Sequence, residues 1–335
     1  MINIAMWVKA LRIIPRISKD EWGALDVISR WLISTRAAVL IMTFISAAIA
    51  GLLAARDGAF NFGPWLLLTV GLIMAHATNN LLNDYTDYVR GVDKDNYFRA
   101  QYGPQPLEHG LMTKRELLTY AIVTGLIALA CGAYLVYVRG ALALILLGLG
   151  AFFVLFYTWP LKYVGLGEVA VLLVWGPLMI GGGYFVITGT WSWTAVIASL
   201  PYALGPTTVI FGKHIDKCAE DKAKHIHTLP VILGERSARL IVSVMIVLQY
   251  ATVLYLIITG YFTPILLIVV LAFSMLKMAL TQYQKPKPVE PPAWYPKDVW
   301  PMWFVSLTFV HNRRFGLLFL VGLIGDLILR SVIVR

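Results

Sequence analysis

The feature that most constrains this 335-residue chain is a series of apolar stretches, each about long enough to cross a lipid bilayer as a helix. A crossing helix needs about 20 apolar residues. With only 14% charged residues, against about 25% in soluble proteins, the chain is not a soluble enzyme, a disordered chain or a fibrous repeat. The sequence therefore predicts an all-α, polytopic membrane protein with nine transmembrane helices. These are expected near residues 33–54, 64–86, 117–138, 141–158, 167–188, 192–212, 238–259, 263–281 and 312–331.

The positive charges are sorted to one side of the predicted membrane. The chain holds 28 Lys and Arg against 18 Asp and Glu, a net charge of +10. Of the 28, 20 fall in the N-terminal segment and in the connections on its side, four fall on the other side, and the remaining four lie near span ends. The positive-inside rule then predicts a cytoplasmic N-terminus, cytoplasmic long loops and an outer C-terminus. Because the positive residues are sorted in this way, the net charge of +10 does not indicate a nucleic-acid partner.

Two domains are expected, an interfacial segment over residues 1–31 and a nine-helix domain over residues 32–335. Residues 1–17 carry basic and apolar residues in the pattern of an amphipathic helix lying on the membrane surface, and no cleavable signal peptide is expected. Cys131 and Cys218 lie far apart and have no metal-ligand spacing, so no disulfide framework is expected.

A first polar cluster lies at the end of the second predicted span. Asn80, Asn83, Asp84 and Asp87 are spaced by three and four residues, so they share one face of a helix. The C-terminus of a helix already carries partial negative charge, and clustered carboxylates there are costly unless a cation binds. The pattern indicates a cation site, and the plainer alternative is a set of solvated charges at the membrane interface.

A second acidic cluster lies at the end of the sixth predicted span, where Asp216, Glu220 and Asp221 are expected to continue the helix past Lys213. Carboxylate and amide oxygens suit hard ions such as Mg²⁺, which keeps waters and is completed by substrate phosphates. Lys and Arg residues are interleaved with both clusters. Acidic groups, a divalent metal and surrounding cations together suit a polyanion such as diphosphate.

Three motifs follow one another along the chain: Asn83-Asp84-Tyr85-x-Asp87-x-x-x-Gly91-x-Asp93; Tyr157-Thr158-Trp159-Pro160-Leu161-Lys162-Tyr163-x-Gly165-Leu166-Gly167-Glu168; and Asp216-x-x-x-x-Asp221 with Thr228-Leu229-Pro230 and Gly234. Together with Arg36, these motifs resemble a known family, the UbiA-type intramembrane aromatic prenyltransferases, and most of all the branch that acts on 1,4-dihydroxy-2-naphthoate. The resemblance covers nearly the whole chain. It departs from the family pattern in the second aspartate motif, whose aspartates are five apart instead of four, and at Ala37, where the family has proline.

The resemblance implies nine helices around a central cavity, with both aspartate motifs under a cytoplasmic cap. It also implies Mg²⁺ as cofactor and a polyprenyl diphosphate and an aromatic acceptor as substrates, in a membrane-lipid environment. Catalytic roles are expected for Asp87, Asp93, Asp216 and Asp221. Metal ligands are expected among Asn83, Asp84, Asp87, Asp216, Glu220 and Asp221. Substrate contacts are expected from Arg36, Asn80, Lys94, Tyr157, Lys162 and Lys213.

The Gly-Leu-Gly-Glu loop and the long spacing from Asp87 to Asp93 favour 1,4-dihydroxy-2-naphthoate as the acceptor. Prenylation of this acceptor is a step of menaquinone synthesis. Hydroxybenzoate, homogentisate, a chlorophyll-type ring or a lipid alcohol are the alternatives. A secondary transporter would place its acids near the bilayer midplane instead of the span ends. A catalytically silent membrane subunit is the third class, suggested by the irregular second motif.

Overall fold

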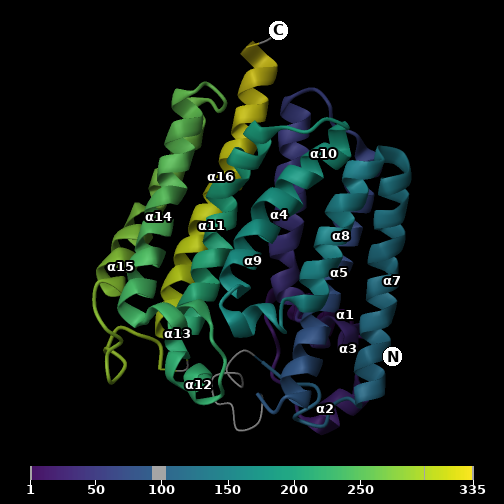
Figure 1. Cartoon of the computed structure of the whole chain (residues 1–335), viewed down its shortest axis with the longest axis vertical. Helices are drawn as coiled ribbons and strands as arrows, with labels where there is room; N and C mark the ends of the chain where they lie inside the picture. Colours follow the sequence, from purple (N-terminus) through teal and green to yellow (C-terminus); the bar gives the residue numbers. More distant parts are fainter. Residues whose placement is uncertain (1, 93–102, 298, 334–335) are drawn as a thin grey trace. The chain divides into compact units, whose positions relative to one another are not determined.

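The computed structural model describes residues 2–92, 103–297 and 299–333, and every regular element in these ranges is a helix (Figure 1). Eight helical segments are long and apolar enough to cross a membrane. A further apolar helix, α8 (Ala141–Phe156), has 16 residues, which is about 24 Å at 1.5 Å per residue. The all-α membrane architecture is therefore confirmed, with one of the nine predicted spans shorter than the rest. The eight long segments are Ala37–Arg56, Phe62–Val89, Lys114–Arg139, Gly167–Thr188, Trp193–Asp216, Glu235–Ile258, Pro264–Tyr283 and Trp303–Val332.

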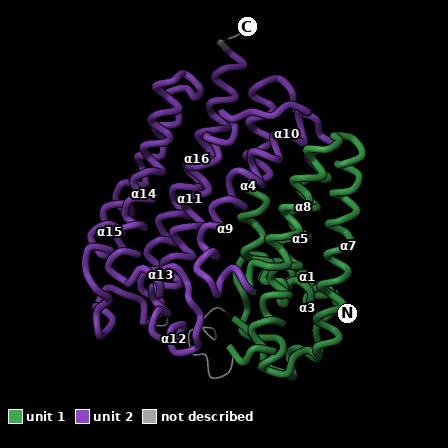
Figure 2. The backbone as a smooth tube through the Cα atoms, viewed as in Figure 1, with its two compact units in different colours: residues 1–45, 66–159 green, residues 46–65, 160–335 purple. Residues whose placement is uncertain are grey.

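The chain divides into two compact units (Figure 2). Unit 1 comprises residues 1–45 and 66–159, and unit 2 comprises residues 46–65 and 160–335. Two helices, α4 (Ala37–Arg56) and α5 (Phe62–Val89), contribute to both units. The first predicted acidic cluster belongs to unit 1 and the second to unit 2.

Unit 1 begins with three short helices, α1 (Ile4–Arg12), α2 (Lys19–Ala24) and α3 (Val27–Ser34). The helix predicted over residues 1–17 ends at Arg12, because Pro15 lacks an N–H and disfavours helical geometry at the residue before it. Asp26 joins α1 to α3, since its carboxylate accepts hydrogen bonds from the Asn3 N–H at 3.0 Å and the Trp7 Nε1–H at 3.0 Å.

The apolar core of unit 1 lies between these short helices and the first transmembrane helices. Trp22, Leu32 and Ile33 of the N-terminal helices pack in one buried cluster with Leu81 of α5 and Leu117 of α7 (Lys114–Arg139). The N-terminal helices thus pack against the end of α5 that carries the first acidic cluster and against the first turns of α7.

Unit 2 is organised around α11 (Trp193–Asp216), which packs against α14 (Glu235–Ile258), α16 (Trp303–Ile333) and the segment of α9 (Gly167–Leu173) and η2 (Val174–Gly181). The segment η2 is π-helical and contains Pro177, whose carbonyl accepts the N–H of Gly182 five residues on. Proline removes one regular helix hydrogen bond, which accounts for a distortion of the helix at this position. The other elements of unit 2 are η1 (Leu161–Val164), α10 (Gly182–Thr188), α12 (Cys218–Ala223), α13 (Leu229–Leu233), η3 (Pro264–Ala272) and α15 (Phe273–Tyr283).

The last helix, α16, begins nine residues earlier than the predicted span. The predicted start at residue 312 falls in a polar run, residues 311–314, that lies inside the helix. His311 and Asn312 are buried, whereas Arg313 and Arg314 are exposed. The four polar residues therefore divide between the inner and outer faces of one continuous helix.

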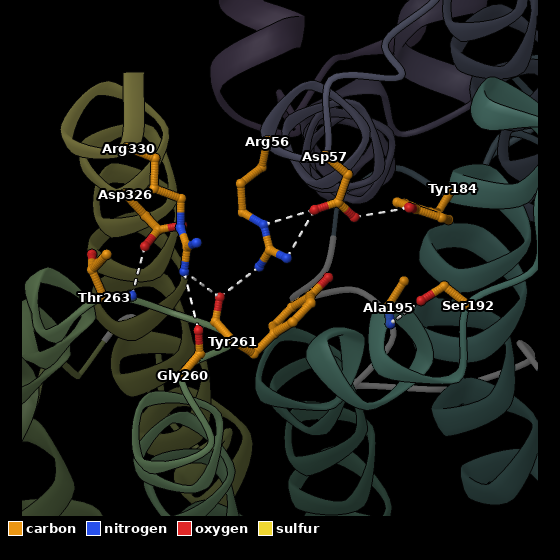
Figure 3. A network of polar contacts seen from close by, with 10 residues as sticks. All are labelled: Arg56, Asp57, Tyr184, Ser192, Ala195, Gly260, Tyr261, Thr263, Asp326 and Arg330. Atoms are coloured by element: carbon orange, nitrogen blue, oxygen red, sulfur yellow. Dashed lines mark hydrogen bonds and ion pairs between the residues drawn. The ribbon is translucent and has the colours of Figure 1, made fainter. Parts of the chain in front are cut away.

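At the end of unit 2 where α11 begins, the ends of several helices are joined by a polar network (Figure 3). Arg56 forms an ion pair with Asp57 at 2.8 Å and donates to the Tyr261 carbonyl at 2.7 Å. The Tyr184 hydroxyl donates to Asp57 at 2.8 Å. Burial raises the pKa of Tyr261 to about 12, so this phenol stays protonated at neutral pH.

The same network reaches the end of α16. Arg330 donates to the Tyr261 carbonyl at 2.8 Å and pairs with Asp326 at 3.3 Å. Asp326 in turn accepts the Thr263 N–H at 2.7 Å. Two arginines and two aspartates balance in charge, and together they fix the connection between α14 and η3.

Candidate active site

The first acidic cluster lies on one helix, as its spacing predicts, because α5 runs without a break to Val89. Asn80, Asp84 and Asp87 are buried, and Asn83 is half-buried beside them. Carboxylates buried in this way need compensating charge or hydrogen bonds. The structure supplies part of that compensation from the turn between α3 and α4.

Arg36 occupies this turn in the left-handed backbone conformation, with φ of 55°. Its guanidinium reaches α5, where Nη2 lies 2.5 Å from Asp84 Oδ1 and 3.4 Å from Asn83 Oδ1. The side chains of Arg36 and Asp84 are 15% and 4% exposed, so the ion pair is largely shielded from water. Because left-handed backbone is costly for a non-glycine residue, the pair holds Arg36 in a strained position directed at the cluster.

Two amide side chains fix the same face of α5. Asn80 donates to the Thr35 carbonyl at 2.8 Å, and Asn83 donates to Thr158 Oγ1 at 3.0 Å. With its nitrogen engaged, Asn83 directs its oxygen to the side where Arg36 and Asp84 lie. Tyr157, next to Thr158, is half-buried. Of the other predicted site residues, Asp93 and Lys94 lie outside the described residues.

The second acidic cluster is not a continuous helix, contrary to the prediction. The helix α11 ends at Asp216, Lys217 leaves helical geometry with φ of −105° and ψ of 10°, and α12 starts at Cys218. The five-residue spacing between the aspartates thus spans a break between two helices. Asp216 is buried and accepts the backbone N–H groups of Phe304 at 3.1 Å and Val305 at 3.0 Å.

The remaining predicted site residues of unit 2 differ in their burial and in their charged partners. Asp221 is buried and pairs with Lys217 at 3.3 Å, whereas Glu220 is exposed. Lys213 is half-buried. Lys162 is also half-buried, with its ammonium 5.7 Å from the centre of the Tyr163 ring.

A buried polar pair beside the second cluster has no counterpart in the predicted site. Glu168 Oε1 lies 2.7 Å from His214 Nδ1 and also accepts the Leu229 N–H at 3.3 Å. Both side chains are nearly inaccessible. The signal in the sequence was a lone glutamate at the start of the apolar stretch 167–188, because a buried carboxylate needs a partner.

Lys287 is a second residue near the site that the sequence does not predict, and it contacts Asp216. It belongs to the proline-rich connection between α15 and α16, and its ammonium lies 3.5 Å from Asp216 Oδ1. The segment has no helical or strand periodicity, so nothing in its sequence relates Lys287 to a residue 71 positions earlier.

The donor set fits Mg²⁺. The first cluster offers oxygen ligands from Asn83, Asp84 and Asp87, and hard oxygen donors are the ones that this ion prefers. The residues with described side chains contain no group of three His, Cys, Asp or Glu arranged around one point. Mg²⁺ usually keeps several waters and takes phosphate oxygens, so one or two carboxylates with an amide are an adequate protein share.

Comparison with known proteins identifies the class. Residues 44–307 match the UbiA prenyltransferase family, and the chain belongs to this family. It is therefore a member of a family of membrane-embedded transferases.

Among its relatives, the 1,4-dihydroxy-2-naphthoate octaprenyltransferase of Escherichia coli is 30% identical over 62% of this chain and 70% of that protein. The same enzyme of Bacillus subtilis is 25% identical over 87% of this chain and 90% of that protein. A UbiA prenyltransferase domain-containing protein 1 homolog of Drosophila melanogaster is 22% identical, and the alignment spans 68% of this chain and only 65% of the fly protein.

Solved structures share the fold at low sequence identity. A UbiA homolog from Aeropyrum pernix has a TM-score of 0.64 at 17% identity, covering 85% of this chain and 97% of its own. A UbiA homolog from Archaeoglobus fulgidus bound to GPP and Mg²⁺ has a TM-score of 0.59 at 13% identity, covering 89% of this chain and 99% of its own. At these identities the likeness establishes the fold alone.

Proposed function

We propose that this protein transfers a polyprenyl group from a polyprenyl diphosphate to an aromatic acceptor in a Mg²⁺-dependent reaction. The observation that carries the proposal is the buried ion pair between Arg36 and Asp84 on the face of α5 that also presents Asn83 and Asp87. Carboxylates and a cation gathered on one helix face suit a metal and a diphosphate together. Family membership supports the same reaction class.

The proposed roles follow from the chemistry of each side chain. Mg²⁺, when bound, supplies charge neutralisation to the diphosphate leaving group. Its ligands are proposed to be Asn83, Asp84, Asp87, Glu220 and Asp221.

Cationic side chains complete the proposed diphosphate contacts. Arg36, Lys162 and Lys213 are proposed to donate charge-assisted hydrogen bonds to diphosphate oxygens, while Asn80 and Tyr157 line the substrate side. The bond between the allylic carbon and the diphosphate oxygen breaks with its electron pair on the diphosphate. A ring carbon of the acceptor then forms the new carbon–carbon bond and loses its proton.

We further propose 1,4-dihydroxy-2-naphthoate as the acceptor, with the reaction on the cytoplasmic side of the membrane. Two relatives with this activity support the acceptor. The placement of 20 of 28 positive residues on one side of the predicted spans supports the orientation.

The decisive experiment is an assay in membranes that contain the protein, with labelled polyprenyl diphosphate, Mg²⁺ and one acceptor at a time. The expected result is a prenylated naphthoate together with released pyrophosphate. Hydroxybenzoate, homogentisate, a chlorophyll-type ring and a lipid alcohol serve as competing acceptors, and preference for any of these would replace the acceptor assignment. A transporter or a silent subunit would release no pyrophosphate with any acceptor.

Metal dependence has its own test in the same membranes. EDTA is expected to abolish turnover, and added Mg²⁺ to restore it. Asp87→Asn is expected to lower turnover by about a hundredfold, the scale on which losing one electrostatic stabiliser of a transition state acts. The control is Asp20→Asn, which changes an exposed acid of α2. Full turnover by the Asp87 variant or in EDTA contradicts the metal proposal.

A further inference from the structure

The carboxylate of Asp216 serves the first turn of α16. Its Oδ1 accepts the N–H of Phe304 and its Oδ2 accepts the N–H of Val305, residues that lie 88 and 89 positions later in the chain. The first N–H groups of a helix have no partner within the helix, and negative charge at this end is favoured by the helix dipole. Asp216 therefore supplies from α11 the anchor that α16 needs at its N-terminus.

The connection that precedes α16 is held at the same point. Lys287 donates to the Pro301 carbonyl at 2.5 Å and lies 3.5 Å from Asp216 Oδ1. Tyr295 donates to the Met302 carbonyl at 2.6 Å. Aromatic rings pack along this segment, with centroids 4.8–6.4 Å apart, at Tyr283, Trp294, Tyr295, Trp300, Trp303 and Phe304.

Gly212 allows the backbone of α11 to lie close to the start of α16. A Cβ atom at this position would lie 2.7 Å from Tyr283 Oη and 2.9 Å from the Phe304 carbonyl oxygen. Tyr283 donates to that same carbonyl at 2.9 Å. The end of α11 and the start of α16 thus meet at a distance that only glycine allows.

The contacts of Asp216 differ in kind from those of Asp221. The Asp216 side chain is 0% exposed, and its two oxygens are bound by backbone amides that cannot leave without disturbing the first turn of α16. Each oxygen already accepts a backbone N–H, and Oδ1 also faces the Lys287 ammonium, so coordination of a cation would compete with the bonds that hold α16. Asp221 is paired instead with a side chain, the ammonium of Lys217 at 3.3 Å.

We propose that Asp216 is a positioning residue, not a metal ligand: it fixes the first turn of α16 and Lys287 of the α15–α16 connection to the end of α11, and leaves Asp221 as the Mg²⁺-binding aspartate of this motif. The assignment of Asp221 rests on the proposed function. The anchoring by Asp216 does not.

The anchoring is tested by amide hydrogen exchange of the purified full-length protein without substrate. Asp216→Asn turns one oxygen acceptor into an NH₂ donor that faces a backbone N–H. Peptides covering residues 303–306 are expected to exchange at least about tenfold faster, as for loss of a hydrogen bond to a charged group. Lys287→Met is expected to accelerate the same peptides by about two- to threefold, and the exposed Lys285→Met is the matched control.

The metal assignment is tested by the Mg²⁺ concentration that gives half-maximal pyrophosphate release. Asp216→Asn is expected to leave this concentration within about twofold of wild type, whereas Asp221→Asn raises it at least about tenfold. Unchanged exchange in Asp216→Asn, or a tenfold rise in its Mg²⁺ requirement, overturns the proposal. If Asp216→Asn does not fold, wild-type exchange rates in Lys287→Met overturn it. Absence of wild-type turnover contradicts the proposed function and leaves the exchange result standing.

Discussion

Arg36 links backbone strain to the charge of the first acidic cluster. It keeps a left-handed conformation that costs free energy, and its guanidinium forms an ion pair with Asp84. The arginine therefore does two things at once, compensating a buried carboxylate and presenting a cation beside the proposed metal ligands.

Replacing Arg36 is expected to be severe. Arg36→Met leaves Asp84 buried without this partner, and we expect a loss of about 3–5 kcal/mol in the free energy of unfolding, measured by denaturation in detergent. In the double variant with Asp84→Asn the loss should be smaller than the sum of the two single losses, because no buried charge is left uncompensated. Arg115→Met, at an exposed arginine, should stay within about 0.5 kcal/mol of wild type. Additive losses in the double variant would contradict the pairing.

Asp26 gives unit 1 a dependence on acid pH. Burial acts to raise the pKa of its carboxyl, but hydrogen bonds from Ser29, Trp7 and Asn3 outweigh it and hold the pKa well below the usual 3.8. A depressed folded-state pKa means that the stabilisation is complete above pH 4 and is lost as pH falls through the lower value. We expect α1 to loosen from α3 in that acid range, seen as faster amide exchange over residues 4–12. Asp26→Asn should show fast exchange at every pH, and a wild-type-like pH profile in this variant would contradict the assignment.

The two aspartate clusters differ in how far a sequence can predict them. Asn80, Asp84 and Asp87 share a helix face because their spacing is local, even though the partners Thr35 and Arg36 are distant in sequence. The contacts of Asp216 involve Phe304, Val305 and Lys287, which no local pattern relates to it. Periodicity predicts a face within one helix, whereas a carboxylate that caps a distant helix depends on tertiary packing.

At the scale of elements, α11 closely approaches the start of α16 at Gly212, four residues before Asp216. Gly212→Ala places a methyl group against Tyr283 Oη and the Phe304 carbonyl. We expect a loss of about 1–3 kcal/mol in the free energy of unfolding, typical of overpacking. Gly148→Ala in α8 is the control, because a Cβ there meets nothing within 4 Å and alanine favours a helix by up to about 1 kcal/mol. Equal stability of the two variants would show that α11 and α16 do not meet as described.

Helix boundaries are where sequence and structure diverge most. The span predicted to start at residue 312 starts at Trp303. The polar residues 311–314 are part of this helix, with Arg313 and Arg314 facing outward and His311 and Asn312 packed inside. A charged run on one face of a helix looks like a boundary when only composition is considered. The break at Lys217 is the opposite case, since the sequence predicts a helix that continues past Lys213 through the acidic residues, whereas the helix ends at Asp216.

At the scale of the whole molecule, charge is what distinguishes the two ends of the spans. In the polar network of Figure 3, Arg56 and Arg330 are paired with Asp57 and Asp326, so half of the four positive residues expected outside are neutralised by adjacent aspartates. The rule for orientation counts Lys and Arg alone, and 20 of these residues lie on the side of the N-terminus and the long loops against four on the other side. The orientation therefore rests on this unequal count of positive residues.

This asymmetry makes sidedness testable within unit 2. Ala59, in the turn after α4, and Ala223, at the end of α12, are both exposed. In a variant whose Cys131 and Cys218 are replaced by serine, Ala59→Cys is expected to react with a membrane-impermeant maleimide in intact cells. Ala223→Cys is expected to react only after lysis, because the basic loops beside it should stay cytoplasmic. Labelling of Ala223→Cys in intact cells would reverse the orientation and move the proposed diphosphate chemistry to the outer face.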